Sequence, residues 1–268
     1  MYDDGKYYIL IAEGVTDCSL LEAILETCLG FVQYQKVSEL PTLFREMIGK
    51  YPTATGELQR QDSPVFFHRN CVGVAVKQAS GCNKIPSKIG MLAELIDKLD
   101  TYESFGGFLV FSDTDLKTKD EIREDFASKF QKDGLVFGND YLILDGNRMV
   151  CKLYLFPTSG VGAVEKLLLA CADLSYGQLC QDARRYRDKI MSEEYRELRK
   201  KHWVKKEAVQ EFYADKVQFG VVSAVLKPDR PVRFAIKDEL IRKNFLDLYM
   251  GLDEFRELHN FLCENLVM

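Results

Sequence analysis

Hydrophobic residues near the start of the chain switch from a strand pattern to a helix pattern. Residues 6–13 (KYYILIAE) are a short aromatic and aliphatic run without helical spacing, which predicts a buried strand. From Leu20 to Leu29 apolar residues recur at helical spacing, and Gly30 follows as a helix stop. The pattern therefore predicts a strand, a turn and a helix in direct succession.

This alternation continues to about residue 157. Further short apolar runs predict strands at residues 66–68, 72–76, 105–113, 141–145 and 151–156. Segments with helical spacing predict helices at residues 38–48, 85–99 and 120–130. Residues 31–70 fit the alternation less well and are interpreted as an insertion. Strands alternating with helices favour an α/β fold with a mostly parallel sheet flanked by helices.

After Pro157 the pattern becomes helical. An apolar helix is predicted at residues 161–172, and residues 174–214 are helical in pattern and rich in charge. Two more helices are expected near residues 237–249 and 253–265. We therefore divide the chain into an α/β core (1–172, with the insertion at about 31–70) and an appended helical C-terminal part (173–268).

The composition narrows the class of protein. With 47% hydrophobic and 29% charged residues, the chain is expected to fold rather than remain disordered. A net charge of −5 argues against a uniformly basic nucleic-acid coat but is compatible with an enzyme that has local basic patches. The acidic opening MYDDGKYYIL does not resemble a signal peptide, and every apolar run is too short to span a bilayer. We expect a soluble, cytoplasmic protein that does not enter the membrane.

Cysteine and histidine usage makes a zinc site improbable on chemical grounds. The eight cysteines form no C-x-x-C pair, and in a cytosolic chain we interpret them as small apolar core residues. The three histidines are scattered along the chain. A histidine-based zinc site is therefore not expected.

Acidic residues follow two of the predicted strands. Glu13 comes directly after the first strand, and Gly14 allows a tight turn toward Asp17 near the start of the next helix. Asp113 and Asp115 follow the strand at 105–113, and both would point to one side if the chain stays extended there. Converging carboxylates repel one another unless a cation neutralises them, and Mg²⁺ or Mn²⁺ prefers such oxygen ligands.

Each of these acids also has an ordinary structural interpretation. Asp17 taken alone is more often a helix cap than a metal ligand. A single Asp-x-Asp is common in turns. Glu13 is more informative, because a carboxylate directly after a buried strand is costly without a partner. The two motifs together, each after a buried strand, are more specific than either alone.

The segments ILIAEGVTD and FLVFSDTD together resemble the TOPRIM domain shared by topoisomerases, bacterial primases and the OLD-family (overcoming lysogenization defect) nucleases. The resemblance covers roughly residues 6–170 and is most specific at these two motifs. It implies a metal site formed by Glu13, Asp113 and Asp115. The Glu-Gly-x-x-Asp form, which adds Asp17, looks most like the nuclease branch.

Two further segments look like small bacterial OLD-like proteins. FPTSGVGAVEKLLLA implies Glu165 as an additional metal ligand, and its alternative is a solvated glutamate on a helix edge. Ser159 and Gly160 lie where backbone amides could meet a phosphate. HWVKKEAVQEFYADK implies Lys206 as a lysine that stabilises the scissile phosphate, with Lys205 as its competitor and a solvated helix surface as the alternative.

The leading functional hypothesis is a nuclease that uses Mg²⁺ or Mn²⁺ to hydrolyse DNA or RNA phosphodiesters, in phage defence or nucleic-acid processing. Glu13, Asp113, Asp115 and Lys206 are its expected catalytic residues, with Glu13 as proton acceptor. The basic segments 184–189 and 196–206 could grip a phosphate backbone, or simply form a solvated helix pair.

Other functions stay open. A TOPRIM module without turnover could act as a binding or regulatory subunit beside an ATPase, which must be another chain because this one has no G-x-x-x-x-G-K-[ST] motif. A phosphatase could use the same acids. Topoisomerase and primase functions rank lower, because no nucleophilic tyrosine or nucleotide-recruiting module is recognisable. Homo-oligomerisation is compatible with every hypothesis.

Overall fold

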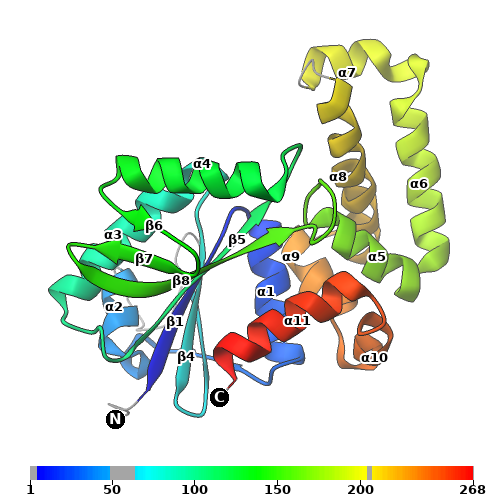
Figure 1. The fold of residues 1–268 in the computed structure, drawn as a ribbon. Helices are drawn as coiled ribbons and strands as arrows, with labels where there is room; N and C mark the ends of the chain where they lie inside the picture. Colours follow the sequence, from blue (N-terminus) through cyan, green and yellow to red (C-terminus); the bar gives the residue numbers. More distant parts are fainter. Residues whose placement is uncertain (1–4, 49–63, 204–206, 268) are drawn as a thin grey trace. The chain divides into compact units, whose positions relative to one another are not determined.

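A mixed eight-stranded sheet gives the chain an α/β fold (Figure 1). The computed structural model describes residues 5–48, 64–203 and 207–267. In spatial order the strands of this part are β2 (Val32–Gln33), β3 (Val65–Arg69), β4 (Val72–Gln78), β1 (Lys6–Ala12), β5 (Phe105–Asp113), β8 (Asn147–Phe156), β7 (Tyr141–Leu144) and β6 (Val136–Phe137).

Parallel pairing is found at the centre of the sheet, where β1 lies between β4 and β5. The flanking pairs β2–β3, β3–β4, β6–β7 and β7–β8 are antiparallel. Links of two residues, such as Asp145–Gly146 with positive φ at both positions, can join only antiparallel neighbours. The prediction of a mostly parallel sheet is therefore right for the core alone, and the segment interpreted as an insertion supplies edge strands.

The described residues fold into two compact units. The first unit comprises the residues up to Ser112, Lys119–Leu155 and the chain from Leu262 onward. The second unit comprises Asp113–Thr118 and Phe156–Phe261. The division predicted near residue 172 marks a change in composition, whereas these units are defined by packing and are discontinuous in sequence.

Helices cover the sheet of the first unit on both faces. Ile9 and Ile11 of β1 join one buried cluster with apolar residues of α2 (Thr42–Ile48), α3 (Ile85–Lys98) and α4 (Lys119–Lys132). Because side chains alternate along a strand, Tyr8 and Leu10 face the other side. There α1 (Val15–Thr27) contacts β1 and β4. This arrangement explains why the central strands are apolar on both faces.

The helix predicted at 38–48 is two separate pieces. A 3₁₀ turn spans Val37–Glu39, and α2 begins only at Thr42. Leu40 between them is extended, with φ −74° and ψ 140°. Pro41 is the reason, because the residue before a proline is sterically driven out of the helical region.

The second unit is helical after Phe156, the last residue of β8. Its helices are α5 (Glu165–Ser175), α6 (Gly177–Met191), α7 (Arg196–His202), α8 (Glu207–Leu226), α9 (Val232–Phe234), a π-helix (Ala235–Leu240), α10 (Leu246–Tyr249) and α11 (Asp253–Leu266), whose last residues belong to the first unit. The predicted helix at 161–172 begins later, at Glu165, and the one at 237–249 is interrupted. α6 packs against α8.

Arg199 explains why the charged segment 174–214 breaks into three helices. This arginine is buried, and its Nη1 donates to the carbonyl oxygens of Ile190 and Ser192, the latter at 2.7 Å. Those carbonyls lie at the end of α6, where they lack partners within the helix. Arg199 of α7 thus ends α6 and fixes the turn that follows it.

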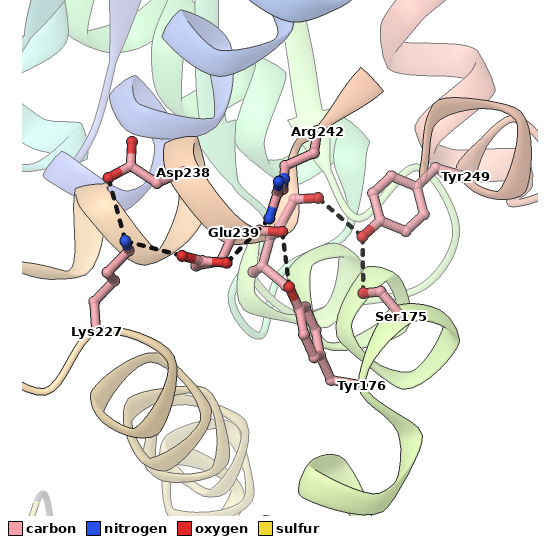
Figure 2. A network of polar contacts seen from close by, with 8 residues as sticks. Ser175, Tyr176, Lys227, Asp238, Glu239, Arg242 and Tyr249 are labelled. Atoms are coloured by element: carbon pink, nitrogen blue, oxygen red, sulfur yellow. Dashed lines mark hydrogen bonds and ion pairs between the residues drawn. The ribbon is translucent and has the colours of Figure 1, made fainter. Parts of the chain in front are cut away.

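A polar network holds the start of α6 to the π-helix within the second unit (Figure 2). The Tyr176 hydroxyl donates to the carbonyl of Glu239, and the carboxylate of Glu239 pairs with Lys227 at 2.9 Å. The fully buried Tyr249 donates to the carbonyl of Leu240 at 3.0 Å and meets Ser175 at 2.9 Å. These contacts give hydrogen-bond donors to carbonyl groups at the C-terminal end of the π-helix.

Two expectations about the whole chain are answered for the described residues. None of their helices is both long and apolar enough to cross a membrane. All eight cysteines are free thiols, of which Cys18, Cys151, Cys171 and Cys180 are buried. Burial raises the pKa of the Cys180 thiol to about 11. The interpretation of these four as apolar core residues agrees with their environment.

Candidate active site

Two neighbouring parallel strands end in acidic residues at the same edge of the sheet. Ala12 of β1 pairs with Phe111 of β5, so Glu13 follows β1 at the edge where β5 ends in Asp113. Carboxyl ends of parallel strands are where functional groups gather in α/β proteins. The two motifs predicted from the sequence therefore come from adjacent strand ends.

Glu13 is half-buried beside a serine. The Ser112 hydroxyl donates to Glu13 Oε2 at 3.5 Å, and the N–H of Gly81 donates to the Glu13 carbonyl at 3.0 Å. Ser112 is itself only 1% exposed. This contact was missed in the sequence, although Ser112 stands directly before Asp113 in the motif. Ser112 orients the carboxylate that follows β1.

Asp17 acts as a helix cap in this structure. The Gly14 N–H donates to Asp17 Oδ2 at 3.0 Å, which closes the first turn of α1. Gly14 has an extended backbone, with φ −127°, so a left-handed conformation is not the reason for a glycine here. What matters is that glycine has no Cβ. An added Cβ would lie 3.0 Å from Asp17 Oδ2. The capping interpretation of Asp17 accounts for this oxygen, and metal binding stays a prediction.

The Asp113–Thr114–Asp115 segment turns instead of staying extended. Asp115 has a left-handed backbone with φ +52°, and the Lys117 N–H donates to the Thr114 carbonyl at 2.9 Å. The extended chain that would direct both carboxylates to one side is therefore not present here. Asp is one of the few residues that tolerate this conformation, because its short polar side chain hydrogen-bonds locally.

This turn is fastened to the loop that precedes α5, within the second unit. Asp113 Oδ1 accepts the Val164 N–H at 2.9 Å. The Gly162 N–H donates to Thr114 Oγ1 at 3.0 Å, and the Asp115 N–H donates to the Gly162 carbonyl at 2.7 Å. These bonds explain why the apolar residues just after Gly160 form a loop and not the predicted first turn of a helix.

Glu165 begins α5 as a buried carboxylate with a cationic partner. It is 7% exposed, and the Lys216 ammonium lies 3.1 and 3.2 Å from its two carboxylate oxygens. The interpretation of Glu165 as a solvated surface residue is therefore wrong. Burying this carboxylate without such a partner would cost about 3–5 kcal/mol.

Lys216 is a site residue that sequence reasoning overlooked. It belongs to α8 and to the same stretch, HWVKKEAVQEFYADK, from which Lys206 was predicted. Both Lys206 and its competitor Lys205 lie outside the described residues. Helical spacing gave no signal for Lys216, because it lies two residues from each of Ala214 and Gln218, which are buried on α8, and residues two apart do not share a helix face.

Asp115 lies in an electrostatic cluster with this ion pair. Burial raises the pKa of Asp115, the Lys216 ammonium opposes that rise, and the Glu165 carboxylate adds to it. Asp215 behaves similarly, because burial raises its pKa against the opposing charges of Lys166 and Arg187. Carboxylates that are costly to ionise mark this part of the second unit as a candidate site.

Replacing Asp115 by Asn should stabilise the protein in a pH-dependent manner, measured in EDTA. The folded protein raises the pKa of Asp115 above its ordinary value of 3.8. The folded state therefore loses stability relative to the unfolded state as pH rises through that value, and Asp115→Asn removes the penalty. Urea titrations from pH 3 to 8 check this. A stability difference that stays constant with pH would contradict it.

The described side chains do not form a ready-made metal centre. No three of their His, Cys, Asp and Glu side chains lie close enough together to hold a metal ion. The predicted ligands instead contact protein groups, such as Gly14 for Asp17, Val164 for Asp113 and Lys216 for Glu165. Their chemistry still suits a hard divalent cation, because every donor is a carboxylate oxygen.

The predicted phosphate contact at Ser159 and Gly160 lies on an exposed loop. Gly160 has a left-handed backbone, with φ +76°. Nearby, the Thr158 N–H donates to Glu254 Oε1 at 3.3 Å. An acidic partner at this loop disfavours an incoming phosphate, so the phosphate contact stays a prediction without a supporting donor.

The basic segments around α6 and α7 are largely neutralised by local acids. Arg184 pairs with Asp173 at 2.8 Å, and Arg185 pairs with Asp182 at 2.9 Å. Three more pairs follow along the same helices: Arg187–Asp188, Arg196–Glu193 and Lys200–Glu197. Exposed pairs of this kind add little stability, but they reduce the net field available to a nucleic acid backbone.

These features define a class: an α/β protein with acidic residues at the carboxyl ends of adjacent parallel strands. No protein-family model matches the chain, and no curated protein matches it. A crystal structure of a hypothetical protein, PH0156, from Pyrococcus horikoshii OT3 is similar, with a TM-score of 0.57 and 15% sequence identity over 96% of this chain and 99% of that chain. At this identity the similarity concerns the fold alone.

Proposed function

We propose that this chain is a divalent-metal-dependent hydrolase of nucleic acid phosphodiesters, built on a TOPRIM-like α/β core. The observation that carries the proposal is the pair of acidic ends on the adjacent parallel strands β1 and β5, Glu13 and Asp113. Their order along the chain is also that of the TOPRIM resemblance. The buried Glu165–Lys216 pair beside Asp115 adds a second charged feature.

Mg²⁺ or Mn²⁺ is the cofactor that suits these donors. The TOPRIM resemblance implies Glu13, Asp113 and Asp115 as its ligands and Asp17 as a further one. Burial raises the pKa of Asp115, and a divalent cation bound there would oppose that rise by favouring the ionised carboxylate. A divalent ion held by these carboxylates supplies Lewis-acid catalysis of phosphodiester hydrolysis.

Glu13 is the proposed proton acceptor. A water molecule attacks phosphorus and its proton passes to the carboxylate. The bond from phosphorus to the leaving oxygen breaks, and that oxygen keeps the electron pair and takes a proton from solvent. Ser112 helps because its hydroxyl donates to Glu13 Oε2 and holds one carboxylate oxygen in place. The second oxygen would then accept the proton.

Lys216 takes the role that the sequence assigned to Lys206. Its side chain is 37% exposed, so it can meet a substrate while remaining next to Glu165. An ammonium at this position would stabilise negative charge that develops on the phosphate. Glu165 would hold the ammonium in place, which makes it a positioning residue for Lys216.

The experiment is a cleavage assay on single- and double-stranded DNA and RNA, with Mn²⁺, with Mg²⁺ and with EDTA. We expect cleavage with either ion and none with EDTA. Lys216→Met should reduce the rate about 100-fold, and it should also lower the free energy of unfolding by about 3 kcal/mol because Glu165 is left buried without a cation.

Two variants make the Lys216 result interpretable. Lys132→Met removes an exposed lysine from α4 and should cleave like wild type. Glu165→Gln combined with Lys216→Met removes both charges, so it should recover stability while remaining inactive. Wild-type protein that cleaves nothing with either ion, or Lys216→Met at full rate, would count against the proposal.

A second candidate is a binding or regulatory subunit that works with a separate ATPase, for example in phage defence. The observation that favours it is the engagement of Asp17, Asp113 and Glu165 by protein donors, without three acids close together in the described part of the chain. Binding of Mn²⁺ and nucleic acid without cleavage, followed by activity when a partner ATPase is added, would favour this function.

A further inference from the structure

Strands β6, β7 and β8 form one end of the sheet, and their two faces differ in character (Figure 1). Leu142 of β7 pairs with Met149 of β8, and both are buried in the cluster that α3 and α4 cover. Because side chains alternate along a strand, the residues next to them point to the other face. We call this second set of side chains the platform; it consists of Val136, Tyr141, Ile143, Arg148, Val150 and Lys152.

The platform is open to solvent, although half of its members are apolar. Val136 and Val150 are 58% and 42% exposed. Arg148 is exposed as well, and Tyr141 and Lys152 are half-buried. Exposed apolar side chains that are gathered on one face and accompanied by polar groups are typical of an interaction surface.

An aromatic ring and a guanidinium group are stacked on the platform. The guanidinium carbon of Arg148 lies 4.2 Å from the centre of the Tyr141 ring. Tyr141 pairs directly with Val150, so Arg148 reaches the ring from the diagonal position on β8. The ring also lies against Gly138, where an added Cβ would be 2.2 Å from Tyr141 Cζ. Glycine at this position therefore leaves the space that the ring occupies.

Both positive charges of the platform are without an acidic partner. Across residues 5–48, 64–203 and 207–267, neither Arg148 nor Lys152 forms an ion pair. The exposed acids at the two ends of β7, Asp140 and Asp145, pair with neither of them. In this respect the platform differs from α6 and α7, where local acids neutralise most of the arginines. Its charge therefore favours an anionic occupant.

Single-stranded nucleic acid has the chemistry that this face can recognise. Its phosphates complement Arg148 and Lys152, and its unpaired bases can stack on Tyr141 or on the guanidinium plane. A duplex keeps its bases stacked on one another and offers only its phosphates. A second copy of the chain seated on the same face would place these cations against the same cations of its partner.

We propose that the platform binds a single-stranded segment of nucleic acid, with one base stacked on the Tyr141–Arg148 pair and phosphates held by Arg148 and Lys152. This inference rests on the proposed function, because it names the form of nucleic acid that the same protein takes. The platform and Glu13 belong to the first unit and to one sheet. A strand held on the platform is thereby held by the same unit as the proposed proton acceptor.

Binding to the full-length chain in EDTA tests this without cleavage. Fluorescence anisotropy would compare short single-stranded DNA and RNA with a duplex of the same sequence. We expect a single strand to bind about tenfold more tightly than the duplex. Tyr141→Leu keeps an apolar side chain over Gly138 but removes the stacking ring, so it should weaken single-strand binding about tenfold and leave duplex binding unchanged.

The salt dependence of binding identifies the role of Arg148. Arg148→Gln should weaken single-strand binding and reduce the slope of log affinity against log salt concentration by about 0.7, which is the value for one phosphate contact. Arg148→Lys should restore that slope without restoring the full affinity, because an ammonium group has no plane on which a base can stack. A merely structural role of Arg148 would leave the slope unchanged.

Arg123→Gln is the matched control. Arg123 is an exposed arginine of α4, which covers the opposite face of the sheet, so this variant should bind like wild type. Urea denaturation checks that every variant is folded, and the exposed position of Arg148 makes its variants the safer ones. Equal affinity for single strand and duplex, or wild-type single-strand binding by Arg148→Gln, would overturn the proposal. Sedimentation that shows a dimer which Val150→Lys dissociates, together with no single-strand binding, would assign the platform to a second copy and also overturn it.

Because binding is measured without metal, its outcome is independent of catalysis. Platform-dependent binding of single strands by a protein that cleaves nothing would reject the proposed function and keep this site. Cleavage with Mn²⁺ at an unchanged rate and affinity in Tyr141→Leu and Arg148→Gln would reject this site and keep the proposed function.

Discussion

Asp113→Asn is expected to lose roughly a thousandfold in metal-dependent cleavage while remaining folded. Asp113 Oδ1 accepts the buried N–H of Val164 at 2.9 Å, and an asparagine carbonyl can accept the same bond. The substitution therefore removes the negative charge and keeps the contact that fastens the loop. Cleavage rates with Mn²⁺ and urea denaturation in EDTA measure the two effects separately.

Two further variants, Asp113→Ala and Asp133→Asn, are compared with Asp113→Asn. The alanine variant leaves the Val164 N–H buried without its acceptor, so it should lose activity and also about 1–3 kcal/mol of stability. Asp133→Asn changes an exposed aspartate beyond α4 and should alter neither quantity. If Asp113→Asn cleaves at the wild-type rate, the carboxylate at the end of β5 has no catalytic role.

Gly107→Ala is expected to have the largest effect on folding. Gly107 lies in β5 with φ +145°, a backbone region that is essentially restricted to glycine. A Cβ there would lie 2.8 Å from Val150 Cβ and 2.9 Å from the Val150 carbonyl oxygen, in the neighbouring strand β8. Strain and clash together should cost more than about 3 kcal/mol, enough to unfold many domains of marginal stability.

Gly134→Ala separates the two causes. Gly134 also has a positive φ, +76°, but nothing lies within 4 Å of an added Cβ. This variant should lose only about 1 kcal/mol, from backbone strain alone. Thermal denaturation followed by circular dichroism compares both variants with wild type. A Gly107→Ala protein as stable as Gly134→Ala would show that β8 adjusts to the added methyl group.

The elements that could be predicted from the sequence are those whose pattern is local. The strand β1, the helix α3 and the strand that ends at Asp113 each show, in the sequence, the spacing of hydrophobic residues typical of their element. The structure contains all three. The acidic strand ends were predictable for the same reason, because Glu13 and Asp113 interrupt or end apolar runs. Local pattern and tertiary burial agree at these places.

The parts that escaped prediction depend on contacts between distant segments. Residues 161–164 have an apolar pattern that suits a helix, yet hydrogen bonds from their N–H groups to Thr114 and Asp113 hold them as a loop. Lys216 could not be chosen over Lys206 from helical pattern alone, since only packing of α8 on α5 selects the lysine that faces Glu165. The left-handed backbone of Asp115 could not be predicted either, because it also depends on contacts between distant segments.

The bond between Val164 and Asp113 gives this candidate site an internal reporter. Val164 is 1% exposed, and its amide proton is held by a side chain whose charge is central to the proposed chemistry. Slow hydrogen exchange at this one amide therefore records that the carboxylate is in place. Spectroscopy of a single backbone position can thus follow the organisation of the site in samples that contain no substrate.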